Sequence, residues 1–138
     1  MPAFDAIQVG QPLPERAHQP TNASLFYYNA AIWNGHRIHY DERYVTEVER
    51  YPAIVVDGPL QVDWLSQVVT EWLGGTGRLV RLKSSHRQAA YLGETLRAGG
   101  EVTAKDPATR EVTLSLHIMN EKGEVLTPGE AVVRFHPE

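Results

Sequence analysis

The residues with the clearest capacity for chemistry lie in one short segment, WNGHRIHYDERY, at positions 33–44. It places Asn34 five residues before His39, with His36 and Arg37 between them. Histidine exchanges protons near neutral pH and can act as a general base. Asparagine cannot exchange protons at that pH, but its amide can hold a water molecule through one acceptor and two donors. The pair therefore predicts a site in which His39 takes a proton from a water molecule that Asn34 positions.

Other interpretations of the same segment stay open. Two histidines three positions apart with an aspartate nearby can ligate a metal, but no third histidine has a useful spacing, so we expect no metal. His36 is either a surface or packing histidine or a residue that orients Asn34 or the substrate. Arg37 is either solvated or, through its forked donors, a partner for a second carboxylate on the substrate.

A second candidate group is the segment DGPL, at positions 57–60. Pro59 suits the first turn of a helix, where unpaired N–H groups and the helix dipole favour negative charge. Gly58 lets a carbonyl group approach closely, so a backbone N–H there is a candidate donor to an oxyanion. Asp57 is interpreted first as a helix-capping acid and second as an acid beside the site.

The chain also contains the helices that could position these groups. Residues 59–73 repeat apolar side chains with a helical period and a wide apolar face, which predicts a largely buried helix that ends at Gly74 and Gly75. Two shorter helices are expected before it, at residues 24–33 with Ser24 as N-cap and at residues 41–51 with Asp41 as N-cap.

Strands make up the rest of the predicted scaffold. Alternating apolar side chains and turn residues predict four strands after the long helix, within residues 78–92, 94–106, 110–120 and 131–136. A further edge strand is expected at residues 6–13. This order is of the α+β class, with an antiparallel sheet packed against one main helix.

Composition narrows the class of protein. The 138 residues suffice for one domain, which we expect to span residues 1–138, and 42% hydrophobic with 22% charged residues is typical of a globular protein. A net charge of −4 with scattered basic residues argues against nucleic-acid binding. The absence of cysteine excludes thiolate nucleophiles and disulfides. Without a signal-like start or a membrane-length apolar run, we expect a cytoplasmic protein with no membrane partner.

Four segments together resemble the MaoC-like hydratases and dehydratases, a family with the hot-dog fold. They are IQVGQPLPE, the run from Asn34 to His39, VVDGPL and AAYLGETLRAGGEVTA. The run NGHRIHYD is most similar to the branch that contains mesaconyl-CoA hydratases and mitochondrial 3-hydroxyacyl-thioester dehydratases. The resemblance implies a single hot-dog domain, in which an antiparallel sheet wraps around the long central helix.

The resemblance also implies a reaction, the reversible and R-specific addition of water to the double bond of an enoyl thioester. CoA, or less commonly an acyl carrier protein, would carry the acyl group, as in fatty acid metabolism, with no metal or other cofactor. In the family an aspartate and a histidine five positions later form the catalytic pair, and this chain retains His39 but has Asn34 in place of the aspartate. The family's oxyanion donor corresponds to Gly58.

Two alternatives follow from the asparagine. The chain could be a catalytically silent, acyl-binding subunit of a hetero-oligomer, or it could be a hot-dog thioesterase. The retained His39 favours the hydratase over both, and on this basis Asn34→Asp is expected to be tolerated or helpful. Relatives in this branch often carry two such repeats, so a chain with one repeat is expected to form a homodimer.

Overall fold

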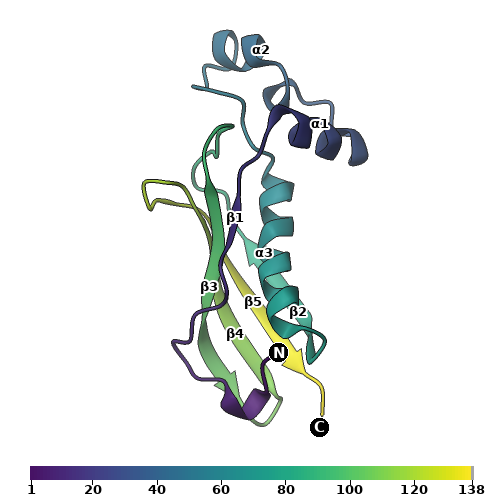
Figure 1. Cartoon of the computed structure of the whole chain (residues 1–138), viewed down its shortest axis with the longest axis vertical. Helices are drawn as coiled ribbons and strands as arrows, with labels where there is room; N and C mark the ends of the chain where they lie inside the picture. Colours follow the sequence, from purple (N-terminus) through teal and green to yellow (C-terminus); the bar gives the residue numbers. More distant parts are fainter. Residues whose placement is uncertain (138) are drawn as a thin grey trace.

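The computed structural model describes residues 1–137 and confirms the predicted α+β architecture. A five-stranded antiparallel sheet curls along one long helix, α3 (Gly58–Leu73), as Figure 1 shows. The strands are β1 (Arg16–His18), β2 (Gly77–Ser84), β3 (Leu96–Asp106), β4 (Glu111–Met119) and β5 (Val125–Phe135). Their order across the sheet is β1-β3-β4-β5-β2, so β1 and β2 form its two edges.

The central helix begins one residue before the predicted Pro59 and ends at Leu73 as predicted. Pro59 occupies its first turn, and Gly74 ends it in the left-handed region at φ 55°, with its N–H 3.1 Å from the carbonyl oxygen of Thr70. Glycine is common at this position because it has no side chain, so it adopts the left-handed conformation without a clash. The buried face consists of Gln61, Trp64, Leu65, Val68, Val69, Trp72 and Leu73.

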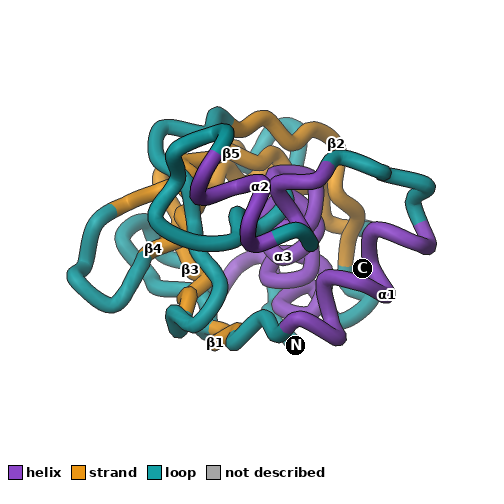
Figure 2. The backbone as a smooth tube through the Cα atoms, turned by 90° about the horizontal axis from the view of Figure 1, so that it is seen from above, coloured by secondary structure: helices purple, strands orange, loops and turns teal. Residues whose placement is uncertain are grey.

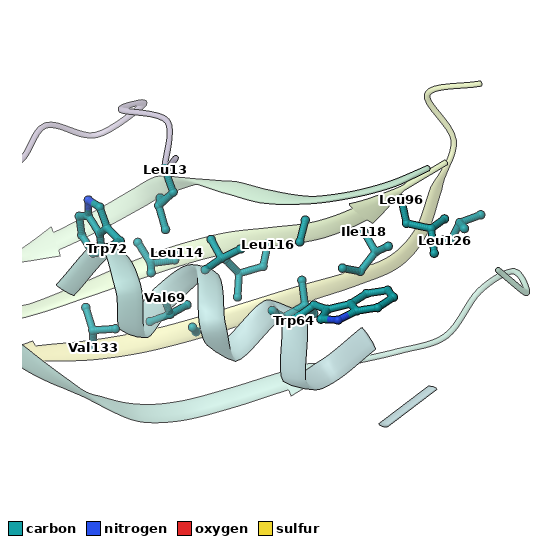
Figure 3. Packing of buried hydrophobic residues seen from close by; sticks show 14 of the residues in the cluster. Leu13, Trp64, Val69, Trp72, Leu96, Leu114, Leu116, Ile118, Leu126 and Val133 are labelled. Atoms are coloured by element: carbon teal, nitrogen blue, oxygen red, sulfur yellow. The ribbon is translucent and has the colours of Figure 1, made fainter. Parts of the chain in front are cut away.

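The hydrophobic core lies between α3 and the concave face of the sheet. In Figure 3, Trp64, Val69 and Trp72 of the helix lie against side chains of β4 and β5. The β4 strand alternates buried and more exposed positions, and its buried positions are Val112, Leu114, Leu116 and Ile118. This alternation is the expected result of successive side chains pointing to opposite faces of a strand.

The four strands predicted after the helix are confirmed, with two changes of bounds. The first of them, β2, ends at Ser84, although the predicted segment runs to residue 92. The last strand begins at Val125 rather than at residue 131, because it is an inner strand that pairs with β2 on one side and β4 on the other. A side chain at Gly129 would lie 3.1 Å from Leu65, so glycine allows the helix to approach the sheet closely. Irregular pairing in β2, β3 and β4 accompanies the curl of the sheet.

The predicted edge strand at residues 6–13 is wrong. Residues Phe4–Ala6 form a 3₁₀ helix, η1, and the edge strand β1 lies further along the chain. The segment still runs beside β3 through single backbone hydrogen bonds, and Pro12 makes an isolated bridge to Glu101. The Gln11 N–H donates to the carbonyl oxygen of Gln8, and Gly10 has a φ of 89°, so the chain turns here and regular pairing with β3 does not continue.

The helices before α3 differ from the prediction mainly at their ends. The first, α1 (Asn22–Ala31), has Thr21 as its N-cap, and Ser24 is the third helical residue that completes a capping box. Asp41 caps α2 (Glu42–Glu47) as predicted, but this helix is shorter than the expected 41–51. A 3₁₀ helix, η2 (Arg37–His39), connects the two.

These short elements gather at one end of the molecule. Figure 1 shows α1 and α2 beyond the start of α3, while the two chain termini lie toward the other end. Viewed from this end in Figure 2, the strands follow an arc around the helices. The fold therefore brings the segment around residue 34 to the start of the central helix.

Within residues 1–137, no helix has the length and apolar character needed to cross a membrane.

Candidate active site

A buried carboxylate, Asp57, is the centre of the candidate site. Its side chain is fully buried at 0% exposure, at the residue before α3 begins. The Nδ2 atom of Asn29 donates to its Oδ1 at 3.0 Å, and Nδ2 of Asn34 donates to its Oδ2 at 3.3 Å. The Nε2 atom of His39 lies 3.5 Å from the same Oδ2. One carboxylate thus contacts side chains from α1, η2 and the loop between them.

The prediction that the Asp57 side chain caps the helix is wrong. Asp57 stands at the N-cap position of α3, but its side chain accepts no hydrogen bond from the first turn of that helix. Its two oxygens are instead used by the amides of Asn29 and Asn34. A buried carboxylate is costly unless it is hydrogen-bonded or paired, and the dipole of α3 adds a favourable field. The side chain is therefore built into the site.

The imidazole of His39 is held in one orientation. Its Nδ1 atom lies 2.7 Å from the backbone carbonyl oxygen of Val55, and the ring is 8% exposed. A carbonyl oxygen only accepts, so Nδ1 carries the hydrogen of this bond. In the neutral ring the lone pair is then on Nε2, the atom that faces Asp57. This is the tautomer that a general base on Nε2 requires.

The amide of Asn34 is also oriented by its partners. Its Oδ1 accepts the backbone N–H of His36 at 3.1 Å, while its Nδ2 donates to Asp57. One N–H and one lone pair of the amide remain for another molecule, because an amide has two donors and can accept twice. The half-buried Asn34 can therefore hold a water molecule while it is fixed from both sides.

His36 and Arg37 are less involved than the other predicted residues. The His36 side chain is exposed and meets the His39 ring edge-to-face at a centroid distance of 5.7 Å. Arg37 binds Asp41 at 2.9 Å and lies 4.2 Å over the ring of Tyr44. The Tyr44 N–H and then the Arg37 guanidinium hold the pKa of Asp41 below its ordinary value. Arg37 is thus engaged within the chain, and its role toward a substrate carboxylate stays a prediction.

Gly58 lies beside a histidine that sequence reasoning did not select. A side-chain carbon at Gly58 would lie 2.8 Å from the Nε2 atom of His86. The Nδ1 atom of His86 is 3.1 Å from the hydroxyl of Thr127, which donates to Oε1 of Gln61 at 2.6 Å. His86 belongs to no motif, and it lies within residues 78–92, which the sequence predicts as a strand. The one available signal was Gln61, a polar residue on the apolar face of the predicted helix.

Asn29 is a second residue that sequence reasoning missed. It lies on the buried face of α1 and also donates to the carbonyl oxygen of Leu25 at 2.8 Å. Within residues 1–137, no group donates to its buried Oδ1. An unpaired buried acceptor costs about 1–3 kcal/mol, and such a cost is found at functional sites. Its only sequence signal is an asparagine in an otherwise apolar helix.

An open hollow borders the two asparagines. Its volume is about 350 Å³, and it is lined by Phe26, Asn29, Ala30, Trp33, Asn34, Gly35 and Tyr40. Trp33 is 94% exposed at its rim and has a φ of 58°, which is strained for a bulky side chain. Neither Asp57 nor His39 lines this hollow. The amides of the site therefore separate the buried carboxylate from an exposed aromatic surface.

Tyr28 adds a neutral phenol to the surroundings of Asp57. Burial, and then the charges of Asp63 and Asp57, raise the pKa of Tyr28 to about 12. The hydroxyl therefore keeps its proton at any physiological pH.

Among the described residues, no three histidine, aspartate or glutamate side chains are grouped as ligands for a metal ion.

This chain has the fold of the hot-dog hydratases and dehydratases. The family model for hydroxyacyl-thioester dehydratase type 2 matches residues 6–92, well over half of the 138-residue chain. The chain belongs to this family. The resemblance to MaoC-like proteins is thereby confirmed.

One relative and two solved structures show the extent of the similarity. The chain is 42% identical over 59 residues to mesaconyl-C(4)-CoA hydratase of Chloroflexus aurantiacus, a match of 43% of the chain and 19% of that protein. The (R)-hydratase from A. caviae involved in PHA biosynthesis has a TM-score of 0.86 at 22% identity, over 95% of this chain and 98% of that one. A MaoC-like dehydratase has a TM-score of 0.89 at 23% identity, over 98% of this chain and 42% of that one. Both similarities show that this chain has the hot-dog fold.

Proposed function

We propose that this chain is a hydro-lyase that reversibly adds water to the double bond of an enoyl-CoA thioester. The observation that carries the proposal is the position of Asp57, whose carboxylate contacts both Asn34 and His39. A carboxylate and an imidazole thus stand together, although an amide occupies the position where the family has its aspartate. The His39 site keeps its acid–base chemistry because a different segment contributes the carboxylate.

The reaction is a balanced transfer of the parts of one water molecule. Asn34 holds the water, and Nε2 of His39 takes one of its protons while the hydroxide adds to the β-carbon. The negative charge that develops on the thioester oxygen is received by the backbone N–H of Gly58 at the start of α3. The imidazolium then returns its proton to the α-carbon. Asp57 stabilises the imidazolium while it is charged.

Two features support a homodimer. The sheet ends in strands β1 and β2, whose outer edges present unpaired backbone groups. The chain matches 42% of the length of the MaoC-like dehydratase, so that protein has room for a second domain of this size. Sedimentation at micromolar concentration tests the proposal, with an expected mass of twice the 15.5 kDa chain. A single species at the chain mass would contradict it.

The activity itself is tested by mixing the purified protein with crotonyl-, mesaconyl- and longer enoyl-CoA thioesters. Hydration removes the conjugated double bond, so the enoyl-thioester absorbance should fall, and chiral analysis should show the R product. Release of free thiol would identify a thioesterase instead. No change with any of the thioesters would indicate a silent acyl-binding subunit. His39→Ala is the matched control, and it should remove the absorbance change.

A further inference from the structure

His86 is an oriented imidazole for which the proposed reaction has no use. It lies in the loop between β2 and β3, and the tip of its ring, the Nε2 atom, approaches the backbone of Gly58. Its other nitrogen is held by Thr127, which is 0% exposed, and Thr127 is in turn held by Gln61, which is 2% exposed. Two buried polar side chains thus serve to orient one histidine at the start of α3.

The direction of the hydrogen bonds determines what His86 offers. Nε2 of Gln61 donates to the backbone carbonyl of Val56 at 3.4 Å, so its Oε1 faces Thr127 and accepts the hydroxyl hydrogen. Thr127 has only that one hydrogen, and its oxygen must therefore accept from Nδ1 of His86. In the neutral ring Nε2 then has a lone pair. His86 presents a hydrogen-bond acceptor beside Gly58.

The substrate has a donor close to this position. In either carrier the thioester sulfur is followed by two carbons and then by the first amide N–H of the pantetheine arm. With the thioester oxygen on the N–H of Gly58, this amide lies a few bonds away on the carrier side. The His86 side chain is exposed to solvent, whereas Thr127 and Gln61, which orient it, are buried. An acceptor here suits the carrier arm rather than the acyl chain.

The surface beyond His86 is consistent with this path. Lys83, Ser84, Ser85 and Arg87 line an open hollow of about 280 Å³ beside the same loop. The pantetheine arm ends in a phosphate, which positively charged side chains favour. Glu130 also lines the hollow and lies 3.6 Å from Lys83. Among residues 1–137, Arg87 is the cation of this hollow that has no ion pair.

We propose that His86 is a substrate-binding residue whose Nε2 accepts the first amide N–H of the pantetheine arm, oriented by Thr127 and Gln61. This inference rests on the proposed function, because the thioester must lie at Gly58. It makes His86 a determinant of carrier recognition that leaves the choice of acyl group to other residues. A side chain at residue 58 would displace this imidazole from its position.

Two small thioesters that differ in a single group test the proposal. The first is the crotonyl thioester of N-acetylcysteamine, which retains the amide. The second replaces its N–H by CH₂, which gives a ketone of the same length. One net hydrogen bond is equivalent to a preference of about three- to tenfold in kcat/KM for the amide. His86→Phe, which keeps an aromatic ring, should reduce this ratio to about one by slowing the amide substrate alone. Thr127→Val should reduce it in part.

The outcomes separate His86 from the proposed reaction. An unchanged ratio in His86→Phe would overturn the proposal, whether or not both thioesters react more slowly. In that case His86 would not distinguish the amide N–H from CH₂. Calorimetric binding of the two thioesters gives the same ratio without turnover. A wild-type protein that binds the amide more tightly but hydrates neither thioester would contradict the proposed function and still support the role of His86. Thermal unfolding of each variant confirms that it is folded.

Discussion

The carboxylate of Asp57 lies 3.5 Å from the Nε2 atom of His39, although the two residues come from different segments of the chain. Asp57 is brought there by the start of the central helix, and His39 by the short 3₁₀ helix η2. The amide of Asn34 contacts the same carboxylate oxygen at 3.3 Å. This arrangement changes what is expected of substitutions at position 34.

Exchanging the acid and the amide is the most informative substitution. From the sequence alone Asn34→Asp is expected to be harmless, but the structure places the new carboxylate within about 3.3 Å of Asp57. Two like charges at this distance repel, and Asp57 is fully buried, so the single variant should lose both activity and stability. The double variant Asn34→Asp/Asp57→Asn restores one acid and one amide. Its activity should exceed that expected from the two single variants by about tenfold, a coupling of about 1.4 kcal/mol. Strict additivity of the losses in kcat would contradict this pairing.

Removal of the proposed base should affect turnover rather than binding. His39→Ala is expected to lower kcat roughly 10²–10⁴-fold, the usual contribution of a placed proton-transfer group. The affinity for an enoyl-CoA should change little, which competition binding can measure. His136→Ala, at an exposed position near the C-terminus, is the control and should behave as wild type. Near-normal turnover in His39→Ala would exclude it as the base and direct attention to His36 or Asp57.

Leu65 should be among the most sensitive core positions. It is fully buried on α3, and it packs close to Gly129 of β5. Leu65→Ala removes buried contacts and leaves a cavity, so the free energy of unfolding should fall by about 2–5 kcal/mol in a urea titration. Gln67→Ala, an exposed site on the same helix, should change it by less than about 0.5 kcal/mol. Similar values for the two variants would show that α3 is not the centre of the core.

Acid should destabilise the protein in part through His18. Burial, and then the charge of Arg16, lower the pKa of His18 below its ordinary value of 6.5, and its ring stacks on Trp64 at 4.2 Å. The unfolded chain therefore binds a proton at a higher pH than the folded protein does. The free energy of unfolding should fall as pH decreases through about 6.5 and become level only below the lowered folded pKa.

His18→Phe keeps an aromatic ring against Trp64 and cannot titrate. Thermal unfolding measured between pH 7.5 and pH 5 should therefore show a smaller decrease in Tm for this variant than for wild type. Burial also lowers the pKa of His117, so some of the decrease should remain. Equal slopes for the two proteins would show that His18 does not contribute.

The sequence by itself determined the elements that depend on local patterns. The helical period of residues 59–73, the alternation in the last strands and the Asp41 cap are set by neighbours along the chain, and the structure confirms them. The edge strand expected at residues 6–13 is wrong because pairing depends on a partner strand, and the 3₁₀ helix and the turn at residues 8–11 leave only Pro12 as a bridge to β3. Family resemblance likewise selected Asn34, His39 and Gly58 before any contact was known.

Only the tertiary structure decided which side chains surround these residues. The sequence predicts Asp57 as a helix cap because its position before a helix is a local signal. Its contacts with Asn29, Asn34 and His39 instead join segments that are distant along the chain. The same reason explains why His86 was not selected: its partner Thr127 lies on the last strand, and sheet pairing brings the two together. Local patterns predict where helices and strands form, but the burial and partners of a polar group depend on how those elements pack.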